Sequence, residues 1–95
     1  MKLKILFSDY ETEKAKLVLQ EMTLTACQEL LKRKVIANSV SIYVGYSKDT
    51  IKPAGSSIKL KNATSSYNII SKYVDYLFDK IVVSGILIRR LGISF

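Results

Sequence analysis

The sequence predicts an α+β fold in which two helices cover one face of a four-stranded sheet. Four segments alternate between apolar and polar residues with the period of a strand, and two longer segments repeat apolar residues with helical spacing. These segments follow one another in the order β-α-β-β-α-β. With 95 residues, of which 48% are hydrophobic, the chain can form one domain with its own core.

The first predicted strand covers residues 2–8, KLKILFS. Successive side chains of a strand point to opposite faces, and the alternation in this segment is strict. We expect an apolar inner side and a mainly basic outer side: Leu3, Ile5 and Phe7 inward, and Lys2, Lys4, Leu6 and Ser8 outward. The outer side of this strand is therefore predicted to be cationic.

The first predicted helix begins at residues 9–12 and ends near Lys34. Two start signals precede it: Ser8 is followed three residues later by Glu11, which is a capping-box pattern, and Asp9 can also cap a helix. Apolar residues then recur at helical spacing, and the basic run at residues 32–34 suits the negative end of the helix dipole. The pattern indicates an amphipathic helix.

The second and third strands, residues 38–49 and 56–62, are predicted to form a hairpin around a loop that contains the only proline. Both alternate. The inward positions are Val40, Ile42, Val44, Tyr46, Ile58 and Leu60, and the outward positions are Ser41, Tyr43, Gly45, Ser47, Ser57, Lys59 and Lys61. A second helix is expected to start after a cap at Thr64 or Ser65 and to stop at residues 84–85.

The closing strand, ILIRRLGISF at residues 86–95, contains two adjacent arginines. Its aliphatic residues before and after the arginines have opposite phases, so all of them face inward only if one extra residue lies between Ile88 and Leu91. Such an insertion is a β-bulge, in which Arg89 and Arg90 can both project from the outer side. The alternative is a single arginine that snorkels from an edge strand.

Right-handed crossovers in this order predict a ferredoxin-like split βαβ sandwich with one uncovered sheet face. The outward positions include no acidic residue, because all eight carboxylates fall in predicted helices, caps or the loop after the second strand. The net charge is +7, from fifteen Lys and Arg against eight Asp and Glu. A basic face with small hydroxyl residues is typical of phosphate binding, so a polyanion is the expected partner.

Composition excludes several classes of function. Cys27 is the only cysteine and there is no histidine, which argues against most zinc sites and against Cys/His catalysis. No catalytic residue, metal ligand or cofactor is predicted. The longest apolar runs are far shorter than the ~20 residues of a membrane span, so we expect no membrane contact and a cytoplasmic location.

Three segments resemble the C-terminal little-finger domain of Y-family DNA polymerases, the DinB/UmuC (ImpB/MucB/SamB) group that copies past damaged bases. They are VSIYVGYSKD (40–49), ATSSYNIISKYVDYLFDKI (63–81) and ILIRRLGISF (86–95). In order and spacing the resemblance covers nearly all of residues 1–95. It implies one little-finger-like domain excised from a larger polymerase, and the frequent Lys, Ile and Tyr suggest a low-G+C bacterium.

The resemblance also implies that the open sheet holds the backbone of primer–template duplex in DNA repair by translesion synthesis. Arg89 and Arg90 would contact template phosphates. Further backbone contacts are expected from Tyr43, Gly45, Ser47, Lys48, Ser57, Lys59, Lys61 and Ser94. This fragment would not be an enzyme, because the palm, fingers and thumb have no counterpart in it. Its partners would be duplex DNA, the catalytic core of the same parent chain and, for the parent protein, a sliding clamp.

Two other functions fit the same topology. One is an RNA- or single-strand-binding module, which is disfavoured because the first and third strands, expected to be central, show no outward aromatic residue for base stacking. Only the outward Tyr43 of the second strand could stack a base. The other is a small regulatory domain that oligomerises edge to edge. An acylphosphatase-like enzyme is disfavoured because residues 8–13, SDYETE, are acidic where a phosphate loop would need donors.

Overall fold

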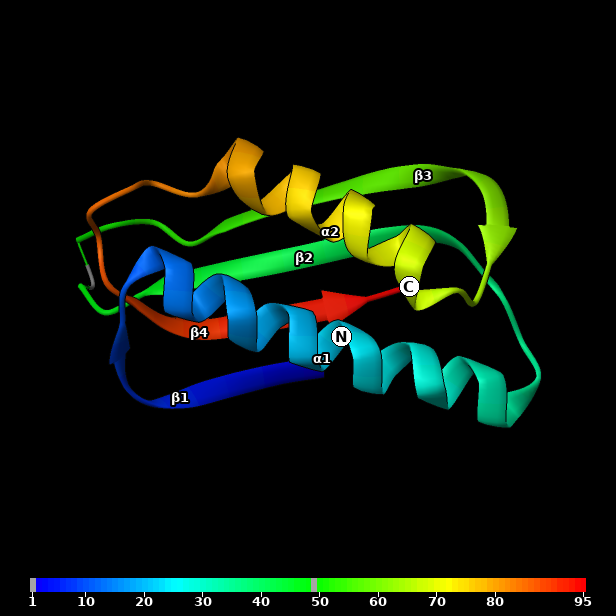
Figure 1. The fold of residues 1–95 in the computed structure, drawn as a ribbon. Coiled ribbons are helices and arrows are strands. Elements are labelled where there is room, and N and C mark those ends of the chain that lie inside the picture. Colours follow the sequence, from blue (N-terminus) through cyan, green and yellow to red (C-terminus); the bar gives the residue numbers. More distant parts are fainter. Residues whose placement is uncertain (1, 49) are drawn as a thin grey trace.

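The computed structural model describes residues 2–48 and 50–95 and shows the predicted order of elements (Figure 1). The elements are β1 (Lys2–Tyr10), α1 (Thr12–Arg33), β2 (Ala37–Tyr46), β3 (Ala54–Thr64), α2 (Tyr67–Ile81) and β4 (Ile88–Ser94). Asp49, the last residue of the second predicted strand, lies outside the described residues. The other boundaries differ from the predicted ones by a few residues, as helix and strand ends commonly do.

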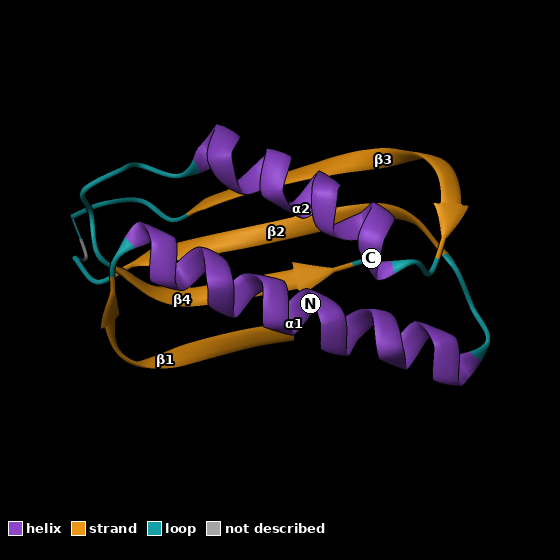
Figure 2. Cartoon of the chain, viewed as in Figure 1, coloured by secondary structure: helices purple, strands orange, loops and turns teal. Residues whose placement is uncertain are grey.

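The four strands form one antiparallel sheet in the order β1-β4-β2-β3. Both helices lie on the same side of this sheet (Figures 1 and 2). The ferredoxin-like α+β fold is confirmed. The expectation that the first and third strands are central is wrong, because β4 and β2 occupy the centre and β1 and β3 are the edges.

The core fills the layer between the helices and the sheet. Apolar side chains from α1, α2 and all four strands are buried there: Leu6, Ala15, Leu19, Ala26, Cys27, Ala37, Val40, Ile42, Val44, Tyr46, Leu60, Ile70, Val74, Leu77, Phe78, Ile88, Leu91 and Ile93. Every predicted inward residue of β2 is in this set. The other face of the sheet has no covering layer among the described residues, and we call it the open face.

The predicted bulge in β4 is confirmed by the pairing with β2. Val44 lies opposite Leu91, and Gly45 lies opposite Arg90, but the next residue, Tyr46, lies opposite Ile88. One step along β2 therefore corresponds to two steps along β4, and Arg89 is the extra residue. The insertion lets Ile88 and Leu91 both point into the core.

The predicted phase of β1 is wrong. Leu6 is the buried residue of this strand, with 2% of its surface exposed, whereas Leu3, Ile5 and Phe7 are 62%, 67% and 94% exposed. Lys4 lies opposite the buried Leu91, so Lys2 and Lys4 belong to the helix side rather than the open face. The two lysines line a hollow beside α1 with Glu21, Met22 and Thr25. At a sheet edge their long stems can carry the ammonium groups out to solvent.

The N-termini of both helices lack the side-chain caps that the sequence predicts. The residue before α1 is Glu11, and no side chain caps the helix, so neither Ser8 nor Asp9 acts as its cap. Both belong to β1. The residue before α2 is Ser66, again without a side-chain cap, and the hydroxyl of Thr64 instead accepts the backbone N–H of Ser66 at 3.0 Å. The N-termini of both helices are thus held by packing against the sheet rather than by a side-chain cap.

Candidate nucleic-acid interface

The register of the sheet defines which residues share the open face, because directly opposed residues of antiparallel strands point to the same side. Between β2 and β4 the open-face pairs are Ser41 with Ser94, Tyr43 with Gly92, and Gly45 with Arg90. Between β3 and β2 they are Lys59 with Ser39, Ser57 with Ser41, and Gly55 with Tyr43. Over these three strands the open face therefore presents hydroxyls, glycines, one tyrosine and cations.

A row of serine hydroxyls crosses three strands of the open face. The Oγ atoms of Ser57 and Ser41 lie 2.6 Å apart, and Ser94 lies on the opposite flank of Ser41. Hydroxyls can donate to phosphate oxygens without a bulky side chain that would keep the backbone at a distance. Ser41 was not among the predicted site residues, although its outward position in the alternation was the signal that could have found it.

Gly45 supports the side chains that cover it. A Cβ atom at this position would lie 3.1 Å from the Cβ of Arg90 and 3.3 Å from the ring and hydroxyl of Tyr43. Gly45 is itself buried, so its backbone lies beneath these two side chains. A glycine at this position therefore allows Tyr43 and Arg90 to pack closely on the open face, where Arg90 remains exposed.

The bulge residue Arg89 has a carboxylate partner. Its Nη1 lies 3.2 Å from Oδ1 of Asp9, and the two side chains are 40% and 39% exposed. The expectation that no carboxylate lies on a strand of the sheet is therefore wrong, because Asp9 is part of β1. The two arginines differ: among the described residues, Arg90 forms no ion pair.

The remaining predicted site residues lie toward the ends of the sheet. Ser47 follows β2 and donates its backbone N–H to the carbonyl of Leu87 at 3.0 Å, and Lys48 next to it is exposed. Lys61 lies near the far end of β3, where its backbone N–H donates to the hydroxyl of Tyr73 at 3.2 Å. The structure brings Tyr43, Gly45, Ser57, Lys59, Arg90 and Ser94 together, with the other residues at the margins.

The fourth strand gives the open face a different character. Ile5 lies opposite Arg90 and Leu3 lies opposite Gly92, so these two exposed aliphatic side chains continue the open-face rows onto β1. With the exposed Phe7 they form what we call the apolar strip: Leu3, Ile5 and Phe7. The open face is thus polar and basic over β3, β2 and β4, and apolar along the β1 edge.

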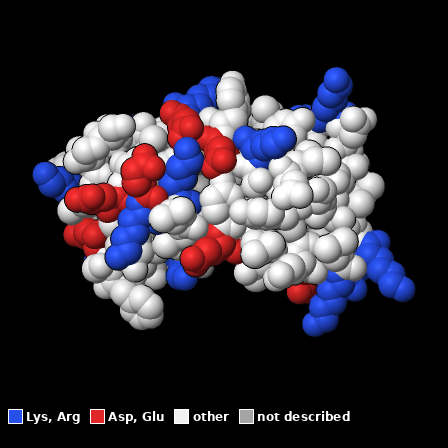
Figure 3. All heavy atoms as spheres, in the orientation of Figure 1, with Lys and Arg blue, Asp and Glu red and all other residues white. Residues whose placement is uncertain are grey.

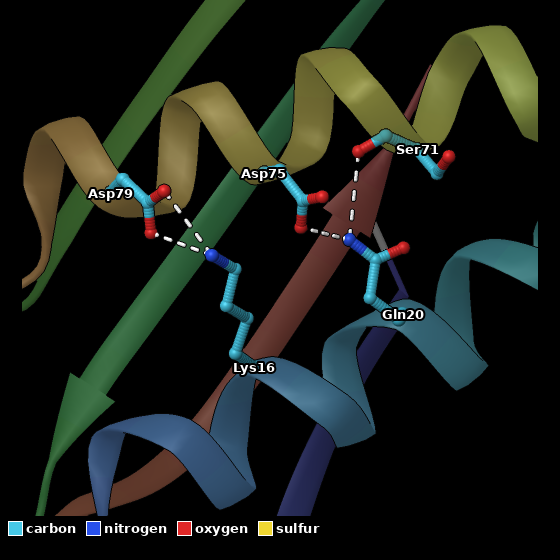
Figure 4. A network of polar contacts seen from close by, with 5 residues as sticks. All are labelled: Lys16, Gln20, Ser71, Asp75 and Asp79. Carbon is cyan, nitrogen blue, oxygen red and sulfur yellow. Dashed lines mark hydrogen bonds and ion pairs between the residues drawn. The ribbon is translucent and has the colours of Figure 1, made fainter.

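The helix layer on the other side mixes both signs of charge (Figure 3). Lys16 of α1 lies 2.9 Å from Oδ1 of Asp79 on α2, and Gln20 contacts Asp75 and the carbonyl of Ser71 (Figure 4). The hydrogen bond to Asp79 raises the pKa of Lys16, although its partial burial acts in the opposite direction. Asp75 and Asp79 are therefore engaged between the two helices and lie away from the open face.

Two further observations concern the part of the chain that the structure describes. No helix within it has both the length and the apolar character to cross a membrane. No three His, Cys, Asp or Glu side chains within residues 2–48 and 50–95 come close enough together to hold a metal ion.

A known protein family and several solved structures are similar to this chain. The impB/mucB/samB family C-terminal domain matches residues 4–95. Among solved structures, an insertion ternary complex of Dbh DNA polymerase aligns with a TM-score of 0.72 and 14% identity over 97% of this chain and 26% of the polymerase chain. A complex of the beta-clamp processivity factor and the little finger domain of PolIV aligns with a TM-score of 0.69 and 8% identity, over 97% of this chain and 81% of the matched chain.

No curated protein sequence matches the chain. The chain spans about a quarter of the Dbh polymerase chain, which contains further parts beyond the matched domain. The family match covers nearly all of the sequence, and both structural matches align over 97% of this chain. The chain therefore belongs to the impB/mucB/samB family and corresponds to its C-terminal domain, the little finger of Y-family DNA polymerases.

Proposed function

We propose that this domain holds primer–template duplex DNA through phosphate contacts from the open face, without sequence preference. The observation that carries the proposal is the placement of Arg90 and Lys59 on the same face as the serine row of β3, β2 and β4. Guanidinium and ammonium groups neutralise phosphate, and small hydroxyls allow the backbone to approach closely. Because phosphates are the same at every base pair, such contacts carry no sequence information.

Within this proposal the residues have different roles. Arg90 is the central phosphate ligand, Lys59 is the second, and Ser41, Ser57 and Ser94 donate hydrogen bonds between them. Lys48, Ser47 and Lys61 contact the backbone at the two ends of the face. Gly45 and Tyr43 hold Arg90 in position, since the Cβ of Arg90 lies directly over Gly45.

The parent protein is proposed to be a translesion DNA polymerase whose catalytic core precedes this domain. The domain itself would bind DNA and would not catalyse nucleotide transfer. The complex of the beta-clamp processivity factor with the little finger of PolIV supports a sliding clamp as a partner of the parent protein. A cytoplasmic location, where bacterial DNA is found, goes with this proposal.

A salt titration of duplex affinity tests the proposal. Fluorescence anisotropy would be recorded with a labelled primer–template duplex and three chains: wild type, Arg90→Ala/Lys59→Ala, and the control Lys32→Ala/Lys80→Ala. The control removes the same charge from exposed positions of α1 and α2. We expect the open-face variant to bind more weakly and to flatten the log–log salt slope by about 1 to 2 units.

The control variant should keep nearly the wild-type slope, because its charges lie outside the proposed contact surface. Equal losses in both variants would show that net charge, rather than the open face, attracts the duplex. Thermal unfolding of all three chains would verify that the differences in affinity do not come from unfolding.

A second candidate function gains from the corrected phase of β1. The argument against single-strand binding relied on the absence of an exposed aromatic from this strand, yet Phe7 is 94% exposed. Phe7 on β1 and the half-buried Tyr43 on β2 each offer a ring on which an unpaired base can stack. Tighter binding of an unstructured strand than of a duplex, with a selective loss in Phe7→Ala, would favour this function over duplex binding.

A further inference from the structure

The ion pair between Asp9 and Arg89 lies at the β4 bulge, within the sheet that carries the proposed phosphate ligands. Tyr10, which follows Asp9 in β1, lies opposite Ile88, which precedes Arg89 in β4. This pairing places Asp9 beside the bulge. The contact of 3.2 Å between Nη1 and Oδ1 is made by one guanidinium nitrogen and one carboxylate oxygen. Asp9 does not cap α1, and among the described residues the contact with Arg89 is the hydrogen bond that its side chain forms.

A carboxylate and a phosphate are alternative acceptors for the same guanidinium. Both are anions that accept hydrogen bonds from arginine in a similar planar geometry. A phosphate that approaches Arg89 must therefore either displace Asp9 or accept a second negative charge within a few ångströms. Arg90, by contrast, lies exposed over Gly45, and no carboxylate of the described residues pairs with it.

We propose that Asp9 competes with the DNA backbone for Arg89 and thereby limits the affinity of the open face. This inference rests on the proposed function and adds a residue that regulates the same site. In the free domain Arg90 has no carboxylate partner among the described residues, whereas Arg89 offers all of its donors to phosphate only when its ion pair opens. Two free arginines would bind the duplex more tightly. Weaker binding suits a domain that must move along the duplex as synthesis advances.

Asp9→Asn tests the competition directly, because it removes the charge and keeps the shape of the side chain. The matched control is Glu21→Gln, which removes the same charge from an exposed position of α1. We expect Asp9→Asn to bind a labelled primer–template duplex about two- to five-fold more tightly, the gain of freeing one partner of a surface ion pair. Its salt slope should be steeper by about one unit, since one more phosphate is neutralised.

The gain should depend on Arg89 itself. In an Arg89→Ala background, Asp9→Asn should add no affinity beyond the small change seen with Glu21→Gln. Equal gains in Asp9→Asn and Glu21→Gln would overturn the proposal in favour of net charge. Weaker binding by Asp9→Asn would also overturn it, because Asp9 would then orient Arg89 for phosphate rather than withhold it.

Two measurements separate this proposal from the proposed function. If Arg90→Ala/Lys59→Ala weakens binding while Asp9→Asn leaves it unchanged, only the competition fails. If neither the wild type nor Asp9→Asn binds duplex detectably, both fail. Asp9→Ser serves as a second variant, and thermal unfolding shows whether either substitution disturbs the fold; a gain in affinity in both folded variants supports the competition.

Discussion

The two faces of the sheet carry the same alternation of side chains, but among residues 2–48 and 50–95 a second layer covers one of them. On the helix-covered face the inward residues of β4, Ile88, Leu91 and Ile93, are at most 2% exposed. On the open face the equally apolar Ile5 of the neighbouring strand is 67% exposed. The difference shows that burial of an apolar strand residue depends on the layer above it and not on the pattern of the strand alone.

This contrast separates stability from binding in the molecule. The covered face removes apolar area from water and so contributes most of the free energy of folding. The open face contributes little of that energy, and its residues are free to be chosen for a partner. Substitutions on the two faces should therefore act on different measurements, unfolding for one and DNA affinity for the other.

The largest effect is expected from truncation on the covered face. Leu91→Ala should lower the free energy of unfolding by about 2–5 kcal/mol, because Leu91 is fully buried and its loss leaves a cavity. Urea denaturation followed by far-UV circular dichroism measures the change. A loss below about 1 kcal/mol would mean that the layer over β4 is loosely packed and that the contrast between the faces is overstated.

The next effect probes the close packing around Gly45 on the open face. Gly45→Ala would place a Cβ 3.1 Å from the Cβ of Arg90, so β2 and β4 would have to move apart slightly, at a cost of about 1–3 kcal/mol. Gly55→Ala is the matched control, since its nearest atom is the carbonyl oxygen of Ile42 at 3.4 Å. Equal unfolding midpoints in urea for Gly45→Ala and wild type would remove the packing role of Gly45.

The bulge in β4 could be predicted because the apolar residues of this strand change phase at the two arginines. Ile88 and Leu91 cannot both face one side of a regular strand, so the pattern itself requires an extra residue. The strand is central, and its register with β2 is fixed by buried residues on both strands. Where both neighbours constrain a strand, the phase of its apolar residues has one solution that buries all of them.

The phase of β1 could not be predicted in the same way because β1 is an edge strand. A strict alternation of Leu3, Ile5 and Phe7 with lysines fits either face equally well as a pattern. The choice is made by the pairing of Lys4 with Leu91 and of Ile5 with Arg90, which depends on where β1 lies in the sheet. The order of strands also differs from the expected one, and strand order is not encoded in local periodicity.

The candidate site also contains some features that the sequence predicts and others that it does not. The bulge, the outward serines and Lys59 follow from alternation, whose period is local. The partnership of Asp9 and Arg89 joins residues 80 positions apart, and the residue type of Asp9 suggested a helix cap instead. A surface ion pair between distant segments leaves no periodic signal, so only the three-dimensional structure reveals it.

A smaller effect is expected in the helix layer, where Lys16 pairs with Asp79. Lys16→Met should cost about 0.2–1 kcal/mol at pH 7, since the pair is partly exposed and screened by solvent. The folded pKa of Lys16 is raised above its usual 10.5. The contribution of the pair is therefore fully present below that value and is lost as the pH rises through the higher folded pKa.

Urea unfolding of wild type and Lys16→Met at pH 7 and near pH 11 measures this dependence. The difference between the two chains should shrink at the higher pH, whereas a difference that grows with pH would contradict the assigned direction. Lys32→Met is the control, because Lys32 lies exposed in the last turn of α1.

The smallest effect on stability is expected at the apolar strip. Phe7→Ser should change the free energy of unfolding by no more than about 0.5 kcal/mol, because Phe7 already faces water in the folded domain. Leu6→Ser, one residue earlier, is the internal control: it replaces a buried side chain by a hydroxyl in the core and should unfold at clearly lower urea. If Phe7→Ser were the more damaging of the two, the phase predicted from the sequence would be right and the structural assignment of β1 wrong.

Sedimentation of wild type and Phe7→Ser at high concentration adds a second comparison, because an exposed apolar edge strand favours edge-to-edge association. A wild type that associates while Phe7→Ser stays monomeric would show that the apolar strip is a contact surface, and would give the open face two functions divided between its strands.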